Sequence, residues 1–281
     1  MEDLVIFGSN GFVGTAFTRY VFDYLSPKKV SVKGRDDYSV EKTNVVNFIS
    51  TVHNYNVFTD PHLDINTNLN VLIDTLENWR KSGKAEYGCY NFISSWFVYG
   101  SGHDVGEYED CHPRGFYSIT KRCAEQLLKS YCETYGLHYR ILRLGNVIGP
   151  GDKKASKQKN AIQFLANEIK AGRDVEMYGD GTFYRDYIHV NDVARAIALV
   201  IEKGELDYIY NIGNGQQWNF RDILYYIRRI TNSSSKIISI EQPEFHKTVQ
   251  TSTFYMNVEK LRELGFQPEY LHEKLFDTLV T

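Results

Sequence analysis

The feature that most constrains the fold is the alternation of short apolar runs with amphipathic stretches through the first half of the chain. The apolar runs predict buried strands at Leu4–Phe7, Val30–Val32, Asn44–Ile49, Tyr90–Ile93 and Tyr139–Leu144. Helical spacing lies between them at Phe12–Leu25, Asp64–Trp79 and Ser118–Tyr135. Parallel neighbours need crossover connections, which are usually helices. The pattern therefore predicts an α/β fold, a parallel sheet covered on both faces.

Beyond Pro150 the alternation becomes irregular, which predicts a second, smaller lobe. Residues 153–159 form a polar, lysine-rich loop, and helices are expected at Ala161–Ala171 and Phe220–Ile230. We expect a sheet domain at 1–150 and a C-terminal lobe at 151–281, with residues 176–212 returning to the sheet domain.

Composition excludes several classes of function. The 32 basic and 35 acidic residues nearly cancel and do not cluster, so no nucleic-acid partner is expected. The four cysteines form no C-x-x-C pair, so no metal site is expected. No apolar run reaches the roughly 18 residues that cross a bilayer, so no membrane partner is expected. Strand-like residues begin almost at once, without a leader, which favours a cytoplasmic protein with free thiols.

Three glycines, Gly8, Gly11 and Gly14, follow the first predicted strand and open the first predicted helix. Such a turn lets backbone N–H groups and a helix N-terminus approach a pyrophosphate, because no side chains intervene. A plain glycine-rich turn is the alternative. The strand–turn–helix context favours dinucleotide binding by the three glycines together with Phe12 and Val13.

The end of the second predicted strand bears on the choice of dinucleotide. An acid there would hold the ribose hydroxyls of NAD, whereas an arginine would accept the 2′-phosphate of NADP. The position expected for the acid is Gly34, and Arg35 follows it. NAD or NADP is thus the expected cofactor, and Arg35 favours NADP. Two alternatives remain: Asp36 turns inward, or Arg35 is a surface charge.

Ser95, Tyr117 and Lys121 have the chemistry of an acid–base site. Tyr117 and Lys121 stand four residues apart and share one helix face. An ammonium beside a phenol should lower the phenol pKa from about 10 and make the tyrosine a general acid–base. Ser95 would bond the same substrate oxygen. A tyrosine and a lysine at this spacing are common by chance, and the glycine turn and the serine supply the specificity.

The ordered set of motifs resembles the extended short-chain dehydrogenase/reductases of the nucleotide-sugar epimerase/dehydratase family, with likeness to UDP-glucose 4-epimerase. The matching segments are FGSNGFVG (7–14), FISSWFVYG (92–100), YSITK (117–121), RLGNVIGPGD (143–152), YGDGTFYRDYIHVNDVARAI (178–197) and YNIGNG (210–215). The resemblance implies a Rossmann-type doubly wound sheet that binds NAD(P) and a smaller C-terminal lobe that binds a nucleotide-diphosphate sugar. It also implies that Ser95, Tyr117 and Lys121 act as argued above.

The resemblance assigns further roles, residue by residue. On the cofactor side these are Ser50 and Thr51 at a strand end and Asn68 supporting the backbone. On the substrate side these are Asn146 and Arg185 near the diphosphate, Lys247 as a looser second cation, and Val175 and Tyr178 flanking the base. Arginine also suits a diphosphate because of its fixed charge and planar fork. As alternatives, Asn146 caps a turn, Arg185 pairs with Asp186 or Asp192, and Lys247 is solvated.

The chain departs from the family pattern in three places, of which the first two limit the reactions that it could catalyse and the third concerns the sheet. Dehydratases carry an acid pair where this chain has Trp96 and Phe97, which transfer no protons, and decarboxylases also need an acid there. Double epimerase–reductases use a cysteine and a histidine where the chain has Phe97 and Ala161. Residues 36–44 leave room for only a short loop, which predicts a trimmed sheet and a more open adenosine side.

Two enzymatic reactions remain after these exclusions. A 4-epimerase oxidises the sugar C4 hydroxyl and returns the hydride to the other face, whereas an NADPH-dependent 4-keto-sugar reductase transfers hydride once. The GNV, RDYIHV and NIG motifs favour the epimerase, and Arg35 favours the reductase. A non-catalytic nucleotide sensor on this fold is a third hypothesis. The family also implies a homodimer through the helices at 64–79 and 118–135, where Leu127, Leu128 and Tyr131 are available unless they belong to the core.

Overall fold

The computed structural model describes residues 3–24, 29–34, 36–152, 155–249 and 253–281. Its centre is a six-stranded sheet in the order β11-β6-β4-β3-β1-β2, in which every neighbouring pair is parallel. The strands are β1 (Leu4–Phe7), β2 (Val30–Val32), β3 (Asn44–Asn47), β4 (Cys89–Ser95), β6 (His138–Leu144) and β11 (Tyr208–Ile212). The predicted α/β fold with a parallel sheet is confirmed.

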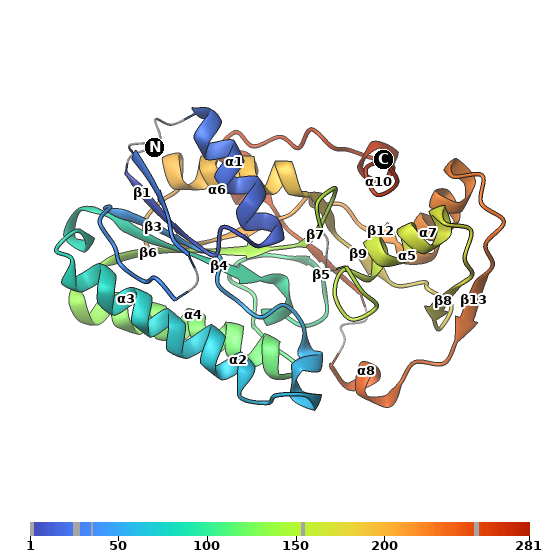
Figure 1. Cartoon of the computed structure of the whole chain (residues 1–281), viewed down its shortest axis with the longest axis horizontal. Coiled ribbons are helices and arrows are strands. Elements are labelled where there is room, and N and C mark those ends of the chain that lie inside the picture. Colours follow the sequence, from blue (N-terminus) through green and yellow to red (C-terminus); the bar gives the residue numbers. More distant parts are fainter. Residues whose placement is uncertain (1–2, 25–28, 35, 153–154, 250–252) are drawn as a thin grey trace.

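Helices cover both faces of this sheet (Figure 1). One face carries α1 (Phe12–Tyr24) and α6 (Val190–Lys203), and the other carries α3 (Val71–Lys81) and α4 (Phe116–Tyr135). Alternate residues of β1 belong to different cores: Leu4 and Ile6 pack with the α1–α6 layer, whereas Val5 and Phe7 pack with the α3–α4 layer. This period of two is what a strand buried on both faces requires. The doubly wound, Rossmann-type arrangement is therefore confirmed.

The direction of strand addition reverses beside β1. The chain places β2 on one side of β1 and then returns to place β3 on its other side. In open α/β sheets, ligands bind outside the carboxyl ends of the strands at such a reversal. The glycine turn after β1 and the segment after β3 both lie there, so the topology locates the site before any side chain is considered.

The segment after β2 is a short loop, as predicted. β2 is the edge strand, and the described residues between 33 and 43 contain no helix or strand. Two side chains of this loop cover the sheet: the Tyr38 ring meets Phe7 edge-on at 6.4 Å, and Val40 is buried in the α3–α4 core. A loop thus replaces the helix and strand that would extend the sheet.

One predicted helix is interrupted. Instead of a continuous helix over Asp64–Trp79, the chain forms α2 (Leu63–Ile65), a π-helical turn η3 (Asn66–Asn70) and then α3. A π turn inserts an extra residue into the helix and often marks a functional position. Here it contains Asn68. The short helices η2 (Asn54–Phe58), η4 (Ala85–Tyr87) and η5 (Trp96–Val98) complete this half of the molecule.

A third core forms from Ile148 and residues beyond 150, and it lies at one end of the sheet (Figure 1). It contains α5 (Ala161–Lys170), α7 (Phe220–Ile230), α10 (Glu273–Asp277) and the paired strands β8 (Val175–Tyr178) and β13 (Ile237–Ile240). The connecting strands are β5 (Gly102–Val105), β7 (Asn146–Ile148), β9 (Tyr184–Arg185), β10 (Tyr187–His189), β12 (Trp218–Asn219) and β14 (Phe254–Met256), with the helices α8 (Glu244–Val249) and α9 (Glu259–Glu263).

Through the part of the chain that the structure describes, no helix is long and apolar enough to cross a membrane.

Candidate functional site

The glycine turn is required by close backbone packing. Gly8 has a φ of +75°, and a Cβ on it would come within 2.9 Å of the Ile49 nitrogen. A Cβ on Gly14 would lie 2.3 Å from the Gly8 carbonyl oxygen. A side chain is therefore excluded at Gly8 and at Gly14. The helix α1 begins between them, at Phe12 and Val13, and the exposed residues Asn10 and Gly11 leave its N-terminus open to an anion. This cradle at the carboxyl edge of the sheet fits the pyrophosphate of a dinucleotide.

Asn68 ties the end of β3 to α4. Its Oδ1 accepts hydrogen bonds from the Thr51 N–H at 3.0 Å and the Ser50 hydroxyl at 3.1 Å. Its Nδ2 donates to the Thr51 hydroxyl at 2.8 Å and to the Thr120 hydroxyl at 2.9 Å. All four bonds connect the π turn to segments that border the site. The geometry is that of a residue supporting the backbone at this edge, which is the role predicted for Asn68.

Asp64 is a buried acid that the sequence did not single out. Its Oδ1 accepts hydrogen bonds from the Thr51 hydroxyl and, at 3.0 Å, from the Asn56 amide. Its Oδ2 is buried without a hydrogen-bond partner among the described residues. The only sequence signal was the unusual density of polar residues that precedes α3. Asp64 thus adds a buried carboxyl group to the same network.

Tyr117 lies near the start of α4, and only 8% of it is exposed. Burial raises the pKa of its phenol, and Asp64 raises it further. Hydrogen bonds with the Ser95 and Ser50 hydroxyls act in the opposite direction without cancelling the rise. Ser95 therefore converges with Tyr117 as predicted, and Ser50 joins them.

Lys121 shares the α4 face with Tyr117 but has different contacts. Its ammonium donates to the Ile93 carbonyl at 2.6 Å and lies 4.1 Å from the centre of the Phe92 ring. Burial lowers the Lys121 pKa to about 7. The prediction that Lys121 lowers the Tyr117 pKa is wrong. Burial raises this pKa, and the Lys121 ammonium bonds the Ile93 carbonyl of β4 instead of the phenol.

Glu125, one turn beyond Lys121, fastens α4 to the sheet. This fully buried carboxylate accepts from the Ser94 hydroxyl at 2.6 Å, from Arg143 at 2.9 and 2.6 Å, and from Arg122 at 2.9 Å. These bonds hold the end of β4, and hence Ser95, against α4. This group is not apparent from the sequence, because only the fold brings Arg143 of β6 to α4.

Trp96 and Phe97, which stand where dehydratases carry acids, form an aromatic wall beside Tyr117. The Phe97 ring meets the Tyr117 ring edge-on at 6.0 Å and stacks on Trp96 at 4.2 Å. Trp96 stacks in turn on Phe254 at 4.6 Å. The Arg185 guanidinium lies 5.4 Å above the Trp96 ring. The wall contains no group that transfers a proton.

Arg185 is buried, and burial lowers its pKa to about 10. Its Nη1 donates to the Tyr184 carbonyl at 2.9 Å, and its guanidinium also lies over Phe183. Asp192, one of the partners considered from the sequence, pairs with Arg195 instead, at 2.7 Å. A buried guanidinium beside the aromatic wall suits an anionic substrate group.

The other predicted substrate residues do not converge as closely. The Asn146 amide donates to the Asp186 carbonyl at 2.9 Å and so helps to join β7 to β10. Val175 and Tyr178 are an odd number of residues apart on β8, so their side chains leave opposite faces of the strand. The Lys247 ammonium pairs with Glu241 at 3.1 Å and Glu244 at 3.3 Å on its own exposed segment.

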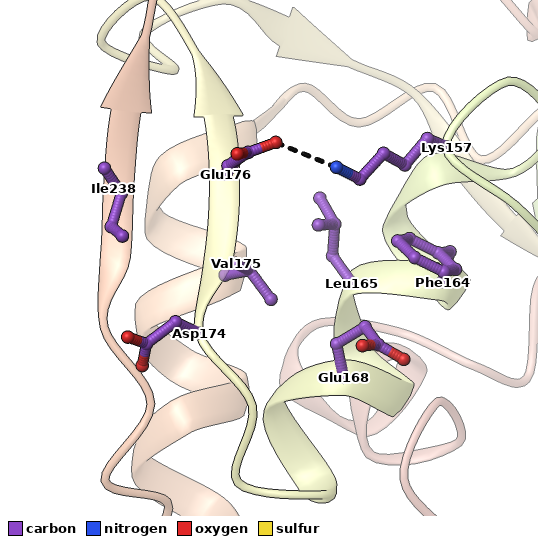
Figure 2. Close-up of a pocket in the computed structure, with 8 residues that line it drawn as sticks. All are labelled: Lys157, Phe164, Leu165, Glu168, Asp174, Val175, Glu176 and Ile238. Atoms are coloured by element: carbon purple, nitrogen blue, oxygen red, sulfur yellow. Dashed lines mark hydrogen bonds and ion pairs between the residues drawn. The ribbon is translucent and has the colours of Figure 1, made fainter.

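Val175 lines a cavity of about 230 Å³ in the C-terminal lobe. Figure 2 shows this cavity between β8, β13 and α5, with Phe164 and Leu165 projecting from α5. The Lys157–Glu176 ion pair, 2.8 Å long, lies at its border. Tyr178 is instead packed against His246, with ring centres 4.6 Å apart. The two residues predicted to flank one base therefore face different surroundings.

Arg35, the residue on which the NADP preference was based, lies outside the described residues. Its neighbour Lys33 is buried at the end of β2, where its ammonium contacts Glu41 at 2.7 Å and Asp37 at 3.8 Å. Asp36 is exposed. Lys33 is thus a buried cation at the end of β2 that was not singled out from the sequence.

Comparison with known proteins gives a family-level match. A model of the NAD dependent epimerase/dehydratase family matches residues 39–213, more than half of the chain. The low-salt glycan biosynthesis protein Agl12 of Haloferax volcanii is 27% identical over 308 aligned positions, which cover 96% of this chain and 95% of that protein.

Solved structures have the same fold over nearly the whole chain. RMD from Pseudomonas aeruginosa, complexed with NADPH, superimposes with a TM-score of 0.84 at 21% identity, covering 100% of this chain and 98% of that one. The UDP-glucose 4-epimerase of Thermotoga maritima, with UDP-glucose, gives a TM-score of 0.84 at 22% identity, covering 99% and 96%. At these identities the likeness shows the fold.

Proposed function

The chain belongs to the NAD dependent epimerase/dehydratase family, and on that premise we propose that it is an NAD(P)-dependent nucleotide-sugar epimerase. The reaction is a transient oxidation at the sugar C4, with Tyr117 as the acid–base. The observation that carries the proposal is that the Ser95 hydroxyl and the Tyr117 phenol lie together beside Phe97, in a glycine-lined α/β sheet. The Phe97 N–H donates to the Ser95 hydroxyl at 3.3 Å, and the Phe97 ring meets the Tyr117 ring at 6.0 Å. This convergence supplies two polar groups for one sugar oxygen.

In the proposed reaction, a bound nicotinamide supplies hydride transfer, which no side chain can perform. In its phenolate form Tyr117 takes the C4 hydroxyl proton, and as the phenol it later returns that proton to the keto oxygen, while Ser95 holds the oxygen in line by a hydrogen bond. Lys121 anchors α4 to β4 through the Ile93 carbonyl, and its pKa of about 7 lets it exchange a proton near neutral pH. The aromatic wall of Trp96, Phe97 and Phe254 excludes water from the reacting carbon.

For the substrate we propose a nucleotide-diphosphate sugar, whose diphosphate is bound by Arg185 and Asn146. The support is the fixed charge of a buried guanidinium beside the aromatic wall. The related fold from Thermotoga maritima was solved with UDP-glucose, which lends support to this substrate class. On the cofactor side the proposed contacts are the glycine turn, Ser50, Thr51 and Asn68.

A second candidate function is an NADPH-dependent nucleotide 4-keto-sugar reductase. The observation that favours it is the raised pKa of Tyr117, because a phenol that holds its proton suits protonation of a keto oxygen. The fold neighbour from Pseudomonas aeruginosa was solved with NADPH, which supports the same reading. An epimerase needs the phenol in both protonation states during one turnover.

The nucleotide that the purified protein retains separates these candidates. The protein is denatured, and the released nucleotide is identified and quantified by chromatography and mass spectrometry. Stoichiometric NAD, together with interconversion of C4-epimeric nucleotide sugars, is the expected result. An empty protein that oxidises NADPH with a 4-keto sugar would establish the reductase instead, and a bound nucleotide sugar without any turnover would favour a non-catalytic sensor.

The proposed assembly is a cytoplasmic homodimer formed through the α2–α3 segment and α4. Phe116, Ile119 and Leu127 form an exposed apolar stripe on α4. Of the residues suggested by the sequence, Leu128 is instead a core residue, and the Tyr131 hydroxyl bonds Glu77 within the chain. Light scattering of the protein and of Leu127→Glu tests this interface, with a dimer expected for the first and a monomer for the second.

A further inference from the structure

We propose that Phe97, supported by Trp96, selects nucleotide sugars that carry a methyl group or a hydrogen in place of the 6-hydroxymethyl group. The inference rests on the proposed function and deepens it, since it names the class of sugar. It follows from the position of the wall relative to the reacting oxygen and from the chemistry of the groups beside that oxygen.

Phe97 is adjacent to both groups that would hold the sugar oxygen. Its backbone N–H donates to the Ser95 hydroxyl at 3.3 Å, and its ring lies 6.0 Å from the Tyr117 ring at an interplanar angle of 78°. The ring is partly exposed, whereas Trp96 behind it is only 3% exposed. A sugar whose oxygen lies between Ser95 and Tyr117 therefore has the phenyl ring of Phe97 beside its reacting carbon.

The wall is rigid, so it does not withdraw from a polar group. Trp96 is stacked on Phe97 at 4.2 Å and on Phe254 at 4.6 Å, and Arg185 lies over it. The short helix η5 is also fixed at its start, because the Ser95 side chain caps it. Phe97 consequently has a filled core behind it and remains at the site.

The two neighbours of a reacting C4 differ in polarity. C3 carries a hydroxyl, whereas C5 carries a hydrogen and C6, so the C5–C6 side is the one that matches an apolar wall. A hydroxyl on C6 would lose water against a phenyl ring, which offers it no conventional hydrogen-bond partner. A methyl group, or the bare C5 of a pentose, meets the ring without that loss. The substrate class is therefore the 6-deoxyhexoses and pentoses linked to a nucleotide.

The experiment compares nucleotide sugars that share one nucleotide and differ only at C6. Suitable pairs are UDP-glucose with UDP-6-deoxyglucose, and GDP-mannose with GDP-6-deoxymannose, each assayed for kcat/KM with the full-length protein. An apolar pocket rejects an added hydroxyl by at most about 100-fold, so we expect a preference for the deoxy sugar of about 10- to 100-fold. Phe97→Gln, which offers a partner to the hydroxyl, should bring the ratio to within about threefold of one.

Phe97→Leu keeps the wall apolar and should retain the preference, and Phe22→Gln, on the exposed surface of α1, is the matched control that should leave the ratio unchanged. If Phe97→Gln fails to fold, the wild-type and Phe97→Leu ratios decide. Turnover with equal or better use of the 6-hydroxy sugar overturns the wall as the selector and leaves the proposed function intact. Turnover of no nucleotide sugar overturns both.

Discussion

The carboxyl edge of the central sheet and the C-terminal lobe hold their candidate residues in opposite ways. At the sheet edge, Ser50, Thr51, Asn68 and Thr120 are joined by hydrogen bonds of 2.8–3.1 Å across three segments of the chain. In the lobe, Val175 and Tyr178 leave opposite faces of β8. Lys247 pairs with acids on its own segment. One half of the candidate site is preorganised, and the other half is dispersed.

The difference follows from how each region is built. The edge belongs to six strands in fixed parallel register, so the residues after β1, β3 and β4 must come together. The lobe candidates lie on the two-stranded β8–β13 sheet and on the six-residue helix α8. We infer that the edge sets the chemistry and that the lobe adjusts to the ligand. Substitutions should then affect turnover and folding at the edge, and substrate affinity in the lobe.

The largest effect is expected for Tyr117→Phe. This change removes the only hydroxyl proposed to exchange a proton with the sugar, and general acid–base groups contribute about 10²- to 10⁴-fold to rates. We expect kcat to fall about 1,000-fold in steady-state assays. The matched control is Tyr225→Phe, on the exposed surface of α7 in the lobe, where kcat should remain within about twofold. A fully active Tyr117→Phe enzyme would remove the catalytic assignment.

The next effect concerns stability at the edge. In Gly14→Ala the new Cβ meets backbone atoms, the Gly8 oxygen at 2.3 Å and the Ser9 Cα at 3.0 Å, so no side chain can move aside. Overpacking of this kind costs up to about 3 kcal/mol, and we expect a loss of that size in urea unfolding. Gly106→Ala is the control, because nothing lies within 4 Å of its Cβ position and its change should stay within about 0.5 kcal/mol. Equal stability of the two variants would show that the turn tolerates side chains.

The sequence predicted the fold well where one local pattern determines one element. β1, β2 and α7 have the predicted bounds, because short apolar runs and a clear helical periodicity leave little choice. The π turn at Asn66–Asn70 was not predictable, since the apolar positions of the expected helix keep their spacing on both sides of it. The helix is interrupted where Asn68 bonds Thr51, in the segment after β3, and Thr120 of α4.

For the candidate site, spacing along the chain predicted proximity but not electrostatics. Ser95 and Tyr117 converge as their positions on β4 and α4 suggested. The pKa of Tyr117 depends instead on burial and on Asp64, and Lys121 is directed at the Ile93 carbonyl, which only the packed sheet provides. In the lobe, connecting loops decide which residues meet, and periodicity carries no information about them.

A smaller effect is expected for Lys121→Met, and it depends on pH. The folded pKa of about 7 lies below the usual 10.5, so the unfolded state binds more protons between these values. The penalty for burying this lysine is full below pH 7 and vanishes as pH rises past 10.5. Replacing it should therefore stabilise the protein at pH 7 by about 1 kcal/mol, or about 2–4 °C in Tm, after loss of the Ile93 bond.

Thermal unfolding from pH 6 to pH 10 checks this prediction. The advantage of Lys121→Met should shrink steadily as the pH rises, while its activity stays low throughout. Lys81→Met, at an exposed position on α3, is the control and should show no comparable trend. A variant that is less stable than the wild type at pH 7 would mean that the ammonium is better solvated than its contacts indicate.

The smallest effect is expected for Lys247→Ala, and it is the change most able to break the comparison between the two regions. The ammonium already pairs with Glu241 and Glu244 on an exposed segment, and such pairs contribute at most about 1 kcal/mol. We expect the nucleotide-sugar KM to change by less than about twofold, as it should for Lys81→Ala, whose ion pair with Glu77 also lies at the surface. If KM rose tenfold for Lys247→Ala alone, α8 would have to move until Lys247 reached the diphosphate. The lobe would then contribute a positive charge to the substrate site, and the substrate would assemble the dispersed half of the site.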